Sequence, residues 1–101
     1  MEKFLSSKGR VVYQEAFFED MRDTYLRKDP WTRLRLKHIE RLVRPSPGDK
    51  IIDLGCAAGA VSHFCWSKGA SVLGVDLSKQ AIAMAKKTFT GKGLSFDKKC
   101  F

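Results

Sequence analysis

Two aspartates and the small residues between them form the part of the sequence best suited to hold a ligand. Asp53 ends an apolar run, and Gly-Cys-Ala-Ala-Gly follows over residues 55–59. Burying a carboxylate is costly unless it has a partner, and two glycines four residues apart let a backbone bend or approach a ligand closely. Asp76 ends a second apolar run, 21 residues after Gly55. A carboxylate at that distance is suited to accept hydrogen bonds from ribose hydroxyls.

Short strands and helices in alternation must position these residues. Apolar, β-rich runs predict three strands, over residues 50–54, 71–75 and 94–96. Helical spacing predicts two helices between them, over residues 59–68 and from a cap at Ser78 to a stop at Gly91. This alternation predicts parallel strands joined by right-handed crossovers, with ligands bound at the carboxyl ends of the strands.

Helical sequence precedes the turn-forming segment PSPGDK at residues 45–50. Apolar residues at helical spacing predict a first helix over roughly 10–27, and its apolar positions are Tyr13, Phe17, Phe18, Met21, Tyr25 and Leu26. Asp29 is expected to cap a second helix that begins at Pro30. Its expected packed arc comprises Trp31, Leu34, Ile39, Leu42 and Val43, with His38 in the same arc. We therefore expect an N-terminal helical segment over 1–46 and an α/β domain over 47–101.

The bulk composition is that of one small globular domain. The chain has 101 residues, of which 44% are hydrophobic, and no apolar run is long enough to cross a membrane. Three cysteines without a CxxC pair indicate neither a disulfide framework nor a metal site, and favour a reduced, cytoplasmic protein. The net charge of +8 favours anionic partners but is also typical of a solvated surface. Nucleic-acid binding has weak support, because no aromatic residues interleave with the basic ones in an RNA-binding pattern.

Two segments taken together, DLGCAAG (53–59) and VLGVDLS (72–78), resemble the class I S-adenosylmethionine-dependent methyltransferases. The first motif of that family is an acidic residue followed by spaced glycines, commonly D-L-G-C-G-x-G, and its second motif ends strand two with an acidic residue. The resemblance covers roughly residues 47–96. It implies a seven-stranded, Rossmann-like parallel sheet, of which this chain supplies the first β-α-β-α-β half after N-terminal helices. One departure is Ala57, which replaces the middle glycine and resists a positive φ.

The resemblance also implies a set of cofactor-binding residues in the two motifs: Asp53, Gly55, Cys56, Ala57, Gly59, Asp76 and Leu77. By that resemblance, Asp53 would help hold the methionine part of S-adenosylmethionine, directly or through water. The backbone of segment 55–59 would line the cofactor. Asp76 would bind both ribose hydroxyls, and Leu77 would pack on the adenine.

The activity that the resemblance implies is methyl transfer by direct displacement to an acceptor, expected to be a small molecule because the N-terminal helices are compact and aromatic. No catalytic base is assigned. The family's substrate-binding and catalytic segments would lie past Phe101, so we expect a partial sequence that is inactive alone. In the family's strand order the first strand is central, and an apolar edge is therefore expected at this strand.

Two other functions stay open. A dinucleotide-binding Rossmann oxidoreductase would share the strands and Asp76, although GCAAGA at 55–60 lacks the second glycine of G-x-G-x-x-G. A non-enzymatic, methyltransferase-like module would bind RNA or a partner through the basic face of the second helix, which carries Arg33, Lys37, Arg41 and Arg44.

For the remaining candidate residues, we consider a purely structural role at least as well supported as a functional one. Cys56 is expected not to be a nucleophile, and His38 and His63, the latter on the outer side of its helix, are expected to be structural or solvated. The aromatic residues of the N-terminal helices are expected either to form a lid over the site or to pack against the sheet.

Overall fold

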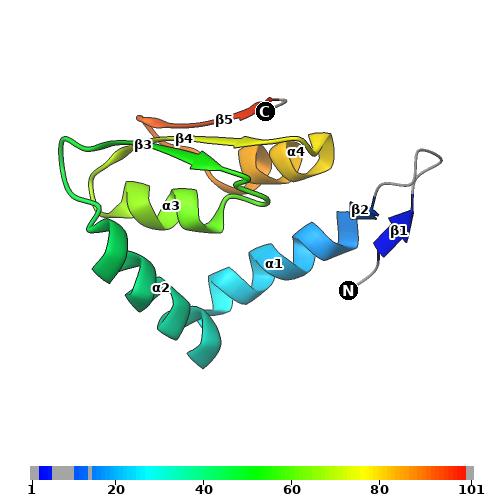
Figure 1. Cartoon of the computed structure of the whole chain (residues 1–101), viewed down its shortest axis with the longest axis horizontal. Helices are drawn as coiled ribbons and strands as arrows, with labels where there is room; N and C mark the ends of the chain where they lie inside the picture. The colour runs from blue at the N-terminus through cyan, green and yellow to red at the C-terminus, as the bar shows by residue number, and fades with distance from the viewer. Residues whose placement is uncertain (1–2, 6–10, 14, 100–101) are drawn as a thin grey trace.

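The computed structural model describes residues 3–5, 11–13 and 15–99, with side chains described for 15–99. A parallel sheet forms one layer, α3 and α4 lie against one of its faces, and α1 and α2 form a further layer beyond them (Figure 1). The elements in chain order are β1 (Lys3–Leu5), β2 (Val11–Tyr13), α1 (Glu15–Arg27), α2 (Pro30–Val43), β3 (Lys50–Leu54), α3 (Ala60–Ser67), β4 (Ser71–Asp76), α4 (Lys79–Thr88) and β5 (Leu94–Lys98).

The main sheet is parallel and has the strand order β3-β4-β5. Ile52 pairs with Leu73, and Leu73 pairs with Ser95, so side chains alternate between the two faces in step across all three strands. The parallel β-α-β-α-β arrangement predicted from the sequence is confirmed. Strand β3 has the predicted bounds, while β4 and β5 extend one and two residues past theirs.

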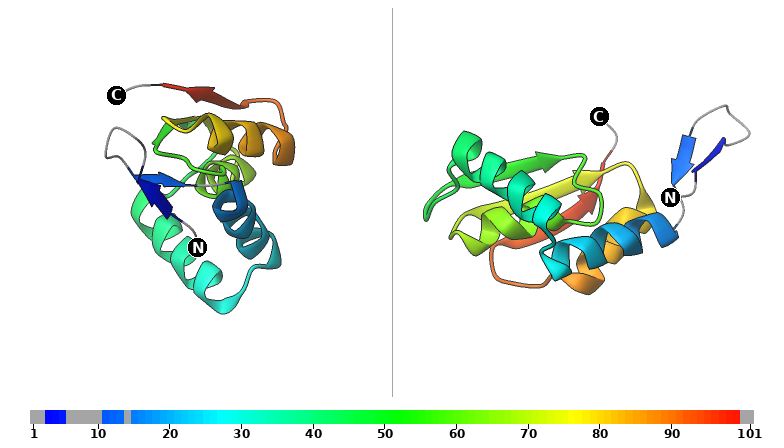
Figure 2. Two further views of the ribbon diagram at one scale, coloured as in Figure 1. Left: turned by 90° about the vertical axis from the view of Figure 1, so that its right-hand side faces the viewer. Right: turned by 90° about the horizontal axis from the view of Figure 1, so that it is seen from below.

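The two faces of this sheet have different surroundings. On the helix-covered face, Val72 and Phe96 are buried in the core with residues of α3 and α4. On the opposite face, Ile52 and Leu54 of β3 are 64% and 69% exposed, and Figure 2 shows no helix on that side. Among the described residues β3 pairs only with β4, so the expected apolar edge is present at β3.

The first predicted helix begins five residues later than expected. Residues Val11–Tyr13 form strand β2, which pairs antiparallel with β1, and α1 starts at Glu15. Tyr13 therefore lies outside the helix, since β pairing with Lys3–Leu5 replaces helical hydrogen bonds there. Within α1, Phe18 and Tyr25 are buried and Leu26 is 54% exposed.

Helix α2 begins and ends as the sequence predicts. The Asp29 carboxylate accepts a hydrogen bond from the Thr32 N–H at 2.8 Å, which caps the helix, and Pro30 occupies its first turn. At the other end, Arg44 adopts a left-handed conformation immediately before Pro45. No helix in the described ranges is long and apolar enough to span a membrane.

The predicted packed arc of α2 is wrong. The buried stripe is Thr32 and Leu36, with Ile39 partly buried, whereas Trp31 and Leu42 are 80% and 84% exposed. The reason is that α2 contacts mainly α3, so a single narrow stripe with spacing i, i+4, i+7 is covered. His38, expected in the packed arc, is also exposed.

Candidate functional site

The loop after β3, residues 55–59, is here called the glycine loop. The N–H groups of Gly55 and Cys56 both donate to the Val75 carbonyl, at 2.8 and 2.9 Å, and fix the loop to the end of β4. Gly55 and Gly59 have φ values of +73° and +90°, which glycine adopts without steric cost. The loop therefore turns sharply at the carboxyl end of the sheet, where ligands of such sheets bind.

Asp76, at the end of β4, joins the glycine loop to α4. One carboxylate oxygen accepts the N–H of Ala57 at 2.8 Å, and the other accepts the N–H of Ser78 at 2.9 Å. Ser78 in turn caps α4, because its hydroxyl accepts the N–H of Ala81 at 3.1 Å. A carboxylate oxygen has two acceptor sites, so each oxygen of Asp76 keeps one for a ligand.

Asp53 lies on the helix-covered face of β3, where its carboxylate accepts the hydroxyl hydrogen of Ser62 at 2.7 Å. Ser62 is fully buried on α3. Burial raises the pKa of Asp53, the Ser62 hydrogen bond partly opposes that shift, and the nearby Asp76 carboxylate adds to it. Two neighbouring carboxylates make this end of the sheet favourable for a cationic group.

Gly59 permits close packing where the loop enters α3. A Cβ at this position would lie 2.8 Å from the Phe96 ring and 3.1 Å from Ala85. The N-cap residue of α3 is Gly59, which has no capping side chain. Apart from the Ser62 N–H, which bonds the Asp53 carboxylate, the first N–H groups of the helix are therefore available to a small anion. The site thus combines donors for an anion with carboxylates for a cation.

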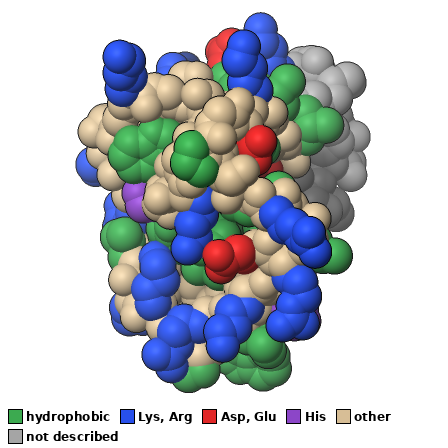
Figure 3. Space-filling view, turned by 90° about the vertical axis from the view of Figure 1, so that its left-hand side faces the viewer, with side chains coloured by type: hydrophobic (Ala, Val, Ile, Leu, Met, Phe, Trp, Pro, Cys, Tyr) green, Lys and Arg blue, Asp and Glu red, His purple; other side chains and the backbone are tan. Residues whose placement is uncertain are grey.

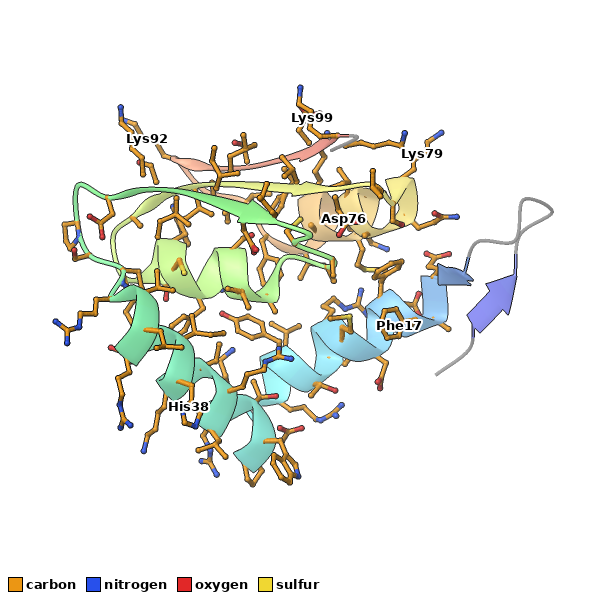
Figure 4. All side chains as sticks on the ribbon, in the orientation of Figure 1. Phe17, His38, Asp76, Lys79, Lys92 and Lys99 are labelled. Atoms are coloured by element: carbon orange, nitrogen blue, oxygen red, sulfur yellow. The ribbon has the colours of Figure 1, made fainter. Side chains whose placement is uncertain are left out.

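Helix α1 covers the glycine loop from the side opposite the sheet. Phe18 and the partly buried Phe17 and Met21 pack with Ala57 and with Ala58, which is 1% exposed. Figure 4 shows Phe17 on the stretch of α1 nearest Asp76. Aromatic residues of the first helix therefore contact the loop directly.

Known proteins share this arrangement. The methyltransferase domain family matches residues 51–100. The chain is 34% identical over 64 residues to the ubiquinone biosynthesis O-methyltransferase of Actinobacillus pleuropneumoniae, covering 63% of this chain and 27% of that one. The structure of an S-adenosylmethionine-dependent methyltransferase from Mesorhizobium loti superposes with a TM-score of 0.58 and 29% identity, over 63% of this chain and 30% of that one. Over residues 51–100, the chain belongs to the class I S-adenosylmethionine-dependent methyltransferase family.

The likeness of this methyltransferase chain to solved structures extends into its N-terminal helices. A TehB-like S-adenosylmethionine-dependent methyltransferase from Corynebacterium glutamicum has a TM-score of 0.62 and 25% identity, and the match covers 85% of this chain and 44% of that one. The chain spans about a quarter of the length of the curated relatives it matches, as the 27% coverage shows.

S-adenosylmethionine, the cofactor of this methyltransferase family, suits the residues present. It carries a sulfonium and an ammonium group, which the carboxylates of Asp53 and Asp76 would stabilise. Its carboxylate suits the free N–H groups at the start of α3. Leu77, beside Asp76, is 55% exposed and therefore accessible to a flat apolar group.

Cys56 is a buried thiol in this methyltransferase site. Burial, with smaller contributions from Asp53 and Asp76, raises its pKa to about 12, so the thiolate is absent at neutral pH. Its Sγ contacts the Ala57 carbonyl oxygen at 3.6 Å. A neutral, buried thiol is a poor nucleophile, because the thiolate is the reactive form. Residues 15–99 bring together no group of three or more His, Cys, Asp or Glu that could hold a metal ion.

The His63 backbone N–H donates to the Gly59 carbonyl of the glycine loop at 2.9 Å, but its side chain packs against residues outside that loop. His38 is on α2, remote from Asp76 (Figure 4). The expectation that His63 faces outward is wrong, because Tyr25 of α1 and Phe89, the residue after α4, cover its side chain. Its Nδ1 lies 2.7 Å from the Tyr25 hydroxyl, and its ring stacks on Phe89 with centroids 4.5 Å apart.

Sequence reasoning found the residues that meet at the strand ends but missed their partners. Asp53, the glycine loop and Asp76 come together as the parallel arrangement requires. Ser62 was missed, although it shares a face of α3 with the buried Cys65, and a polar residue on that face indicates a buried partner.

Proposed function

We propose that this chain is the cofactor-binding part of an S-adenosylmethionine-dependent methyltransferase. In this proposal residues 47–101 hold the cofactor, and residues 1–46 cover it on the acceptor side. The observation that carries the proposal is the Asp76 carboxylate, which bonds both the glycine loop and α4 and keeps one acceptor site on each oxygen. Family membership and the contact of α1 with the loop support it.

Each site residue predicted from the sequence has a physical role in this proposal. Asp76 accepts both ribose hydroxyls, and Leu77 packs on the adenine. Asp53 attracts the positive charge of the methionine part, and the N-terminus of α3 binds its carboxylate. The backbone of the glycine loop, including Cys56 and Ala57, approaches the cofactor closely because its side chains are small.

The proposed reaction is methyl transfer to an oxygen of a small molecule. The bound cofactor supplies an activated methyl group with its own leaving group. The described residues hold and orient it, which lowers the entropic part of the barrier. The oxygen acceptor is inferred from relatives named ubiquinone biosynthesis O-methyltransferases, and the aromatic α1 surface at Phe17 suits an apolar acceptor.

Calorimetric titration of S-adenosylhomocysteine into the full-length natural chain tests this proposal, with NAD titrated alongside. We expect micromolar binding of S-adenosylhomocysteine and none of NAD. Asp76→Asn should weaken binding at least about tenfold, because it removes a charged acceptor. Asp97→Asn is the matched control, since Asp97 is exposed on β5 and its carboxylate forms a surface ion pair with the Lys99 amine at 3.3 Å.

The outcome separates the proposal from its rivals. NAD binding without S-adenosylhomocysteine binding would favour the oxidoreductase reading. A folded, full-length chain that binds neither ligand would overturn the methyltransferase proposal. An equal loss of S-adenosylhomocysteine affinity in Asp76→Asn and Asp97→Asn would show that Asp76 does not bind the ligand.

A further inference from the structure

A groove separates α2 from the C-terminal end of α3, and it is called the basic groove below. Its volume is about 510 Å³, and its apolar lining includes Tyr25, Leu36 and Phe64. Helix α3 has eight residues and is about 12 Å long, so the groove and the glycine loop lie near opposite ends of it. None of the cofactor-site residues named above lines the groove.

Four cationic side chains from three segments line this groove: Lys28, Arg33, Lys37 and Lys68. Figure 3 shows Lys and Arg side chains gathered on the α2 end of the molecule, with apolar side chains among them. Glu40 is the acidic residue in the lining, and it lies 3.6 Å from the Lys68 amine. Within residues 15–99, the other three cations have no carboxylate within 4.0 Å, although Arg33 is near enough to Asp29 to help lower its pKa.

Lys28 is held at the groove in a conformation that costs energy. Its φ is +53°, a region that residues with a side chain rarely adopt. Its amine donates to the Tyr25 carbonyl oxygen at 2.7 Å and lies 3.2 Å from the centroid of the Tyr25 ring. The cation–π contact and the hydrogen bond fix the charge in place, and two N–H donors of the amine are left for a ligand.

We propose that the basic groove binds a phosphate group. A phosphate is multiply charged and accepts several hydrogen bonds, which suits ammonium and guanidinium donors that converge from separate elements. The apolar lining limits water on one side and strengthens each of these bonds. A bound anion would also relieve the mutual repulsion of Lys28, Arg33 and Lys37. This inference is independent of the cofactor site, because the two sites share no residue.

Pyrophosphate is the probe for this site. It is titrated into the full-length chain in phosphate-free buffer at an ionic strength of about 10 mM, where screening extends to about 30 Å. Binding is followed by backbone amide and histidine ring NMR shifts. We expect saturable shifts confined to the surroundings of Lys28, Lys68 and His63, and no competition from S-adenosylhomocysteine. A parallel titration with AMP distinguishes free phosphate from a phosphate carried by an organic group, according to which probe binds more tightly.

Matched variants make the test specific. Lys37→Gln with Lys68→Gln should weaken pyrophosphate binding at least about tenfold. Arg35→Gln with Arg41→Gln removes the same charge from exposed positions of α2 outside the groove, and should change the affinity less than about twofold. If circular dichroism shows that the Lys37→Gln, Lys68→Gln double variant is not folded, the single variant Lys37→Gln, at an exposed position, is used in its place. Equal weakening in both pairs, shifts spread over the whole surface, or no saturation by about 10 mM would overturn the proposal.

Discussion

The N–H of Ala57 donates to the carboxylate of Asp76 over 2.8 Å, and the second oxygen of the same carboxylate accepts the N–H of Ser78. One side chain thus fixes both the glycine loop after β3 and the start of α4. The cofactor site is held by the residue proposed to bind the ribose, so stability and ligand affinity depend on the same carboxylate.

Replacing Asp76 should therefore lower stability even without ligand. Asp76→Ala removes two charge-assisted hydrogen bonds, and we expect the free energy of unfolding to fall by about 2 kcal/mol. Urea unfolding of this variant and of Asp97→Ala measures the effect. The Asp97 change removes only a surface ion pair and should cost less than about 0.5 kcal/mol. A loss of the same size in both variants would contradict this reading of Asp76.

Ala57 occupies a left-handed conformation that its side chain disfavours. Its φ is +49°, so Ala57→Gly should relieve strain and raise the free energy of unfolding by roughly 0.5–1 kcal/mol. The control is Ala83→Gly at an exposed position within α4, where the same change should lower stability by about 1 kcal/mol. Changes of opposite sign in the free energy of unfolding of the two variants, measured by chemical denaturation, would establish the strain. A destabilised Ala57→Gly variant would argue against it.

Asp53 should make the unliganded protein less stable as its carboxyl ionises. Burial raises its folded pKa above the unfolded value of about 3.9, so the folded state holds the proton more tightly. Stability is full below about pH 3.9 and falls as pH rises from there through the folded pKa. Asp53→Asn keeps an acceptor for Ser62 and should be increasingly stabilising, relative to the native chain, from pH 4 toward pH 7. The same variant should bind S-adenosylhomocysteine more weakly. Denaturant unfolding over this range would contradict the expectation if the Asn variant were the less stable protein throughout.

His63 should make stability fall in mild acid. Burial, and to a smaller extent the charge of Lys28, lowers the pKa of the imidazole in the folded state. The unfolded chain then takes up the proton first, so stability is full above about pH 6.5 and is lost as pH falls below it. His63→Gln should flatten the profile between pH 7.5 and 5.5. His38→Gln, at an exposed position of α2, should leave the pH dependence of stability unchanged. If that dependence persisted in the His63→Gln variant, a group other than His63 would be its cause.

Gly59 should be sensitive to both strain and space. Gly59→Ala adds a Cβ at 2.8 Å from the Phe96 ring in a conformation with φ of +90°, and we expect a loss of about 3 kcal/mol. Gly48→Ala has nearly the same φ but meets no atom within 4 Å, so it should cost only about 1 kcal/mol. Thermal unfolding of the two variants separates the clash from the strain. An equal loss of stability in the two variants would show that the Phe96 ring moves aside for the added Cβ at no energetic cost.

Much of the fold follows from local sequence signals. The run Lys50–Leu54, the Asp29 and Ser78 caps and the proline after α2 have strong local preferences, and each lies where it was predicted. The buried face of α2 could not be predicted, because Trp31 and Leu42 are apolar but no described element covers them. Strand β2 was missed because it forms only by pairing with Lys3–Leu5, whose paired residues lie six to ten positions earlier in the chain.

The proximity of Asp53, the glycine loop and Asp76 was predictable from the sequence, but the hydrogen bonds that join them to their partners were not. Parallel strands bring their carboxyl ends to one edge, so Asp53 and Asp76 had to be neighbours. The bonds from Ser62 to Asp53 and from Ala57 to Asp76 depend on how α3 and the loop pack. The roles of these residues toward the cofactor stay predictions.

The exposed face of β3 links the folding of this sheet to association. Ile52 and Leu54 are 64% and 69% exposed, and burying each fully would contribute about 1.5–3 kcal/mol. That sum is comparable with a large part of the net stability of a small domain. Whatever covers the sheet would thus help to fold it, and its midpoint of unfolding should rise with the concentration of the covering surface.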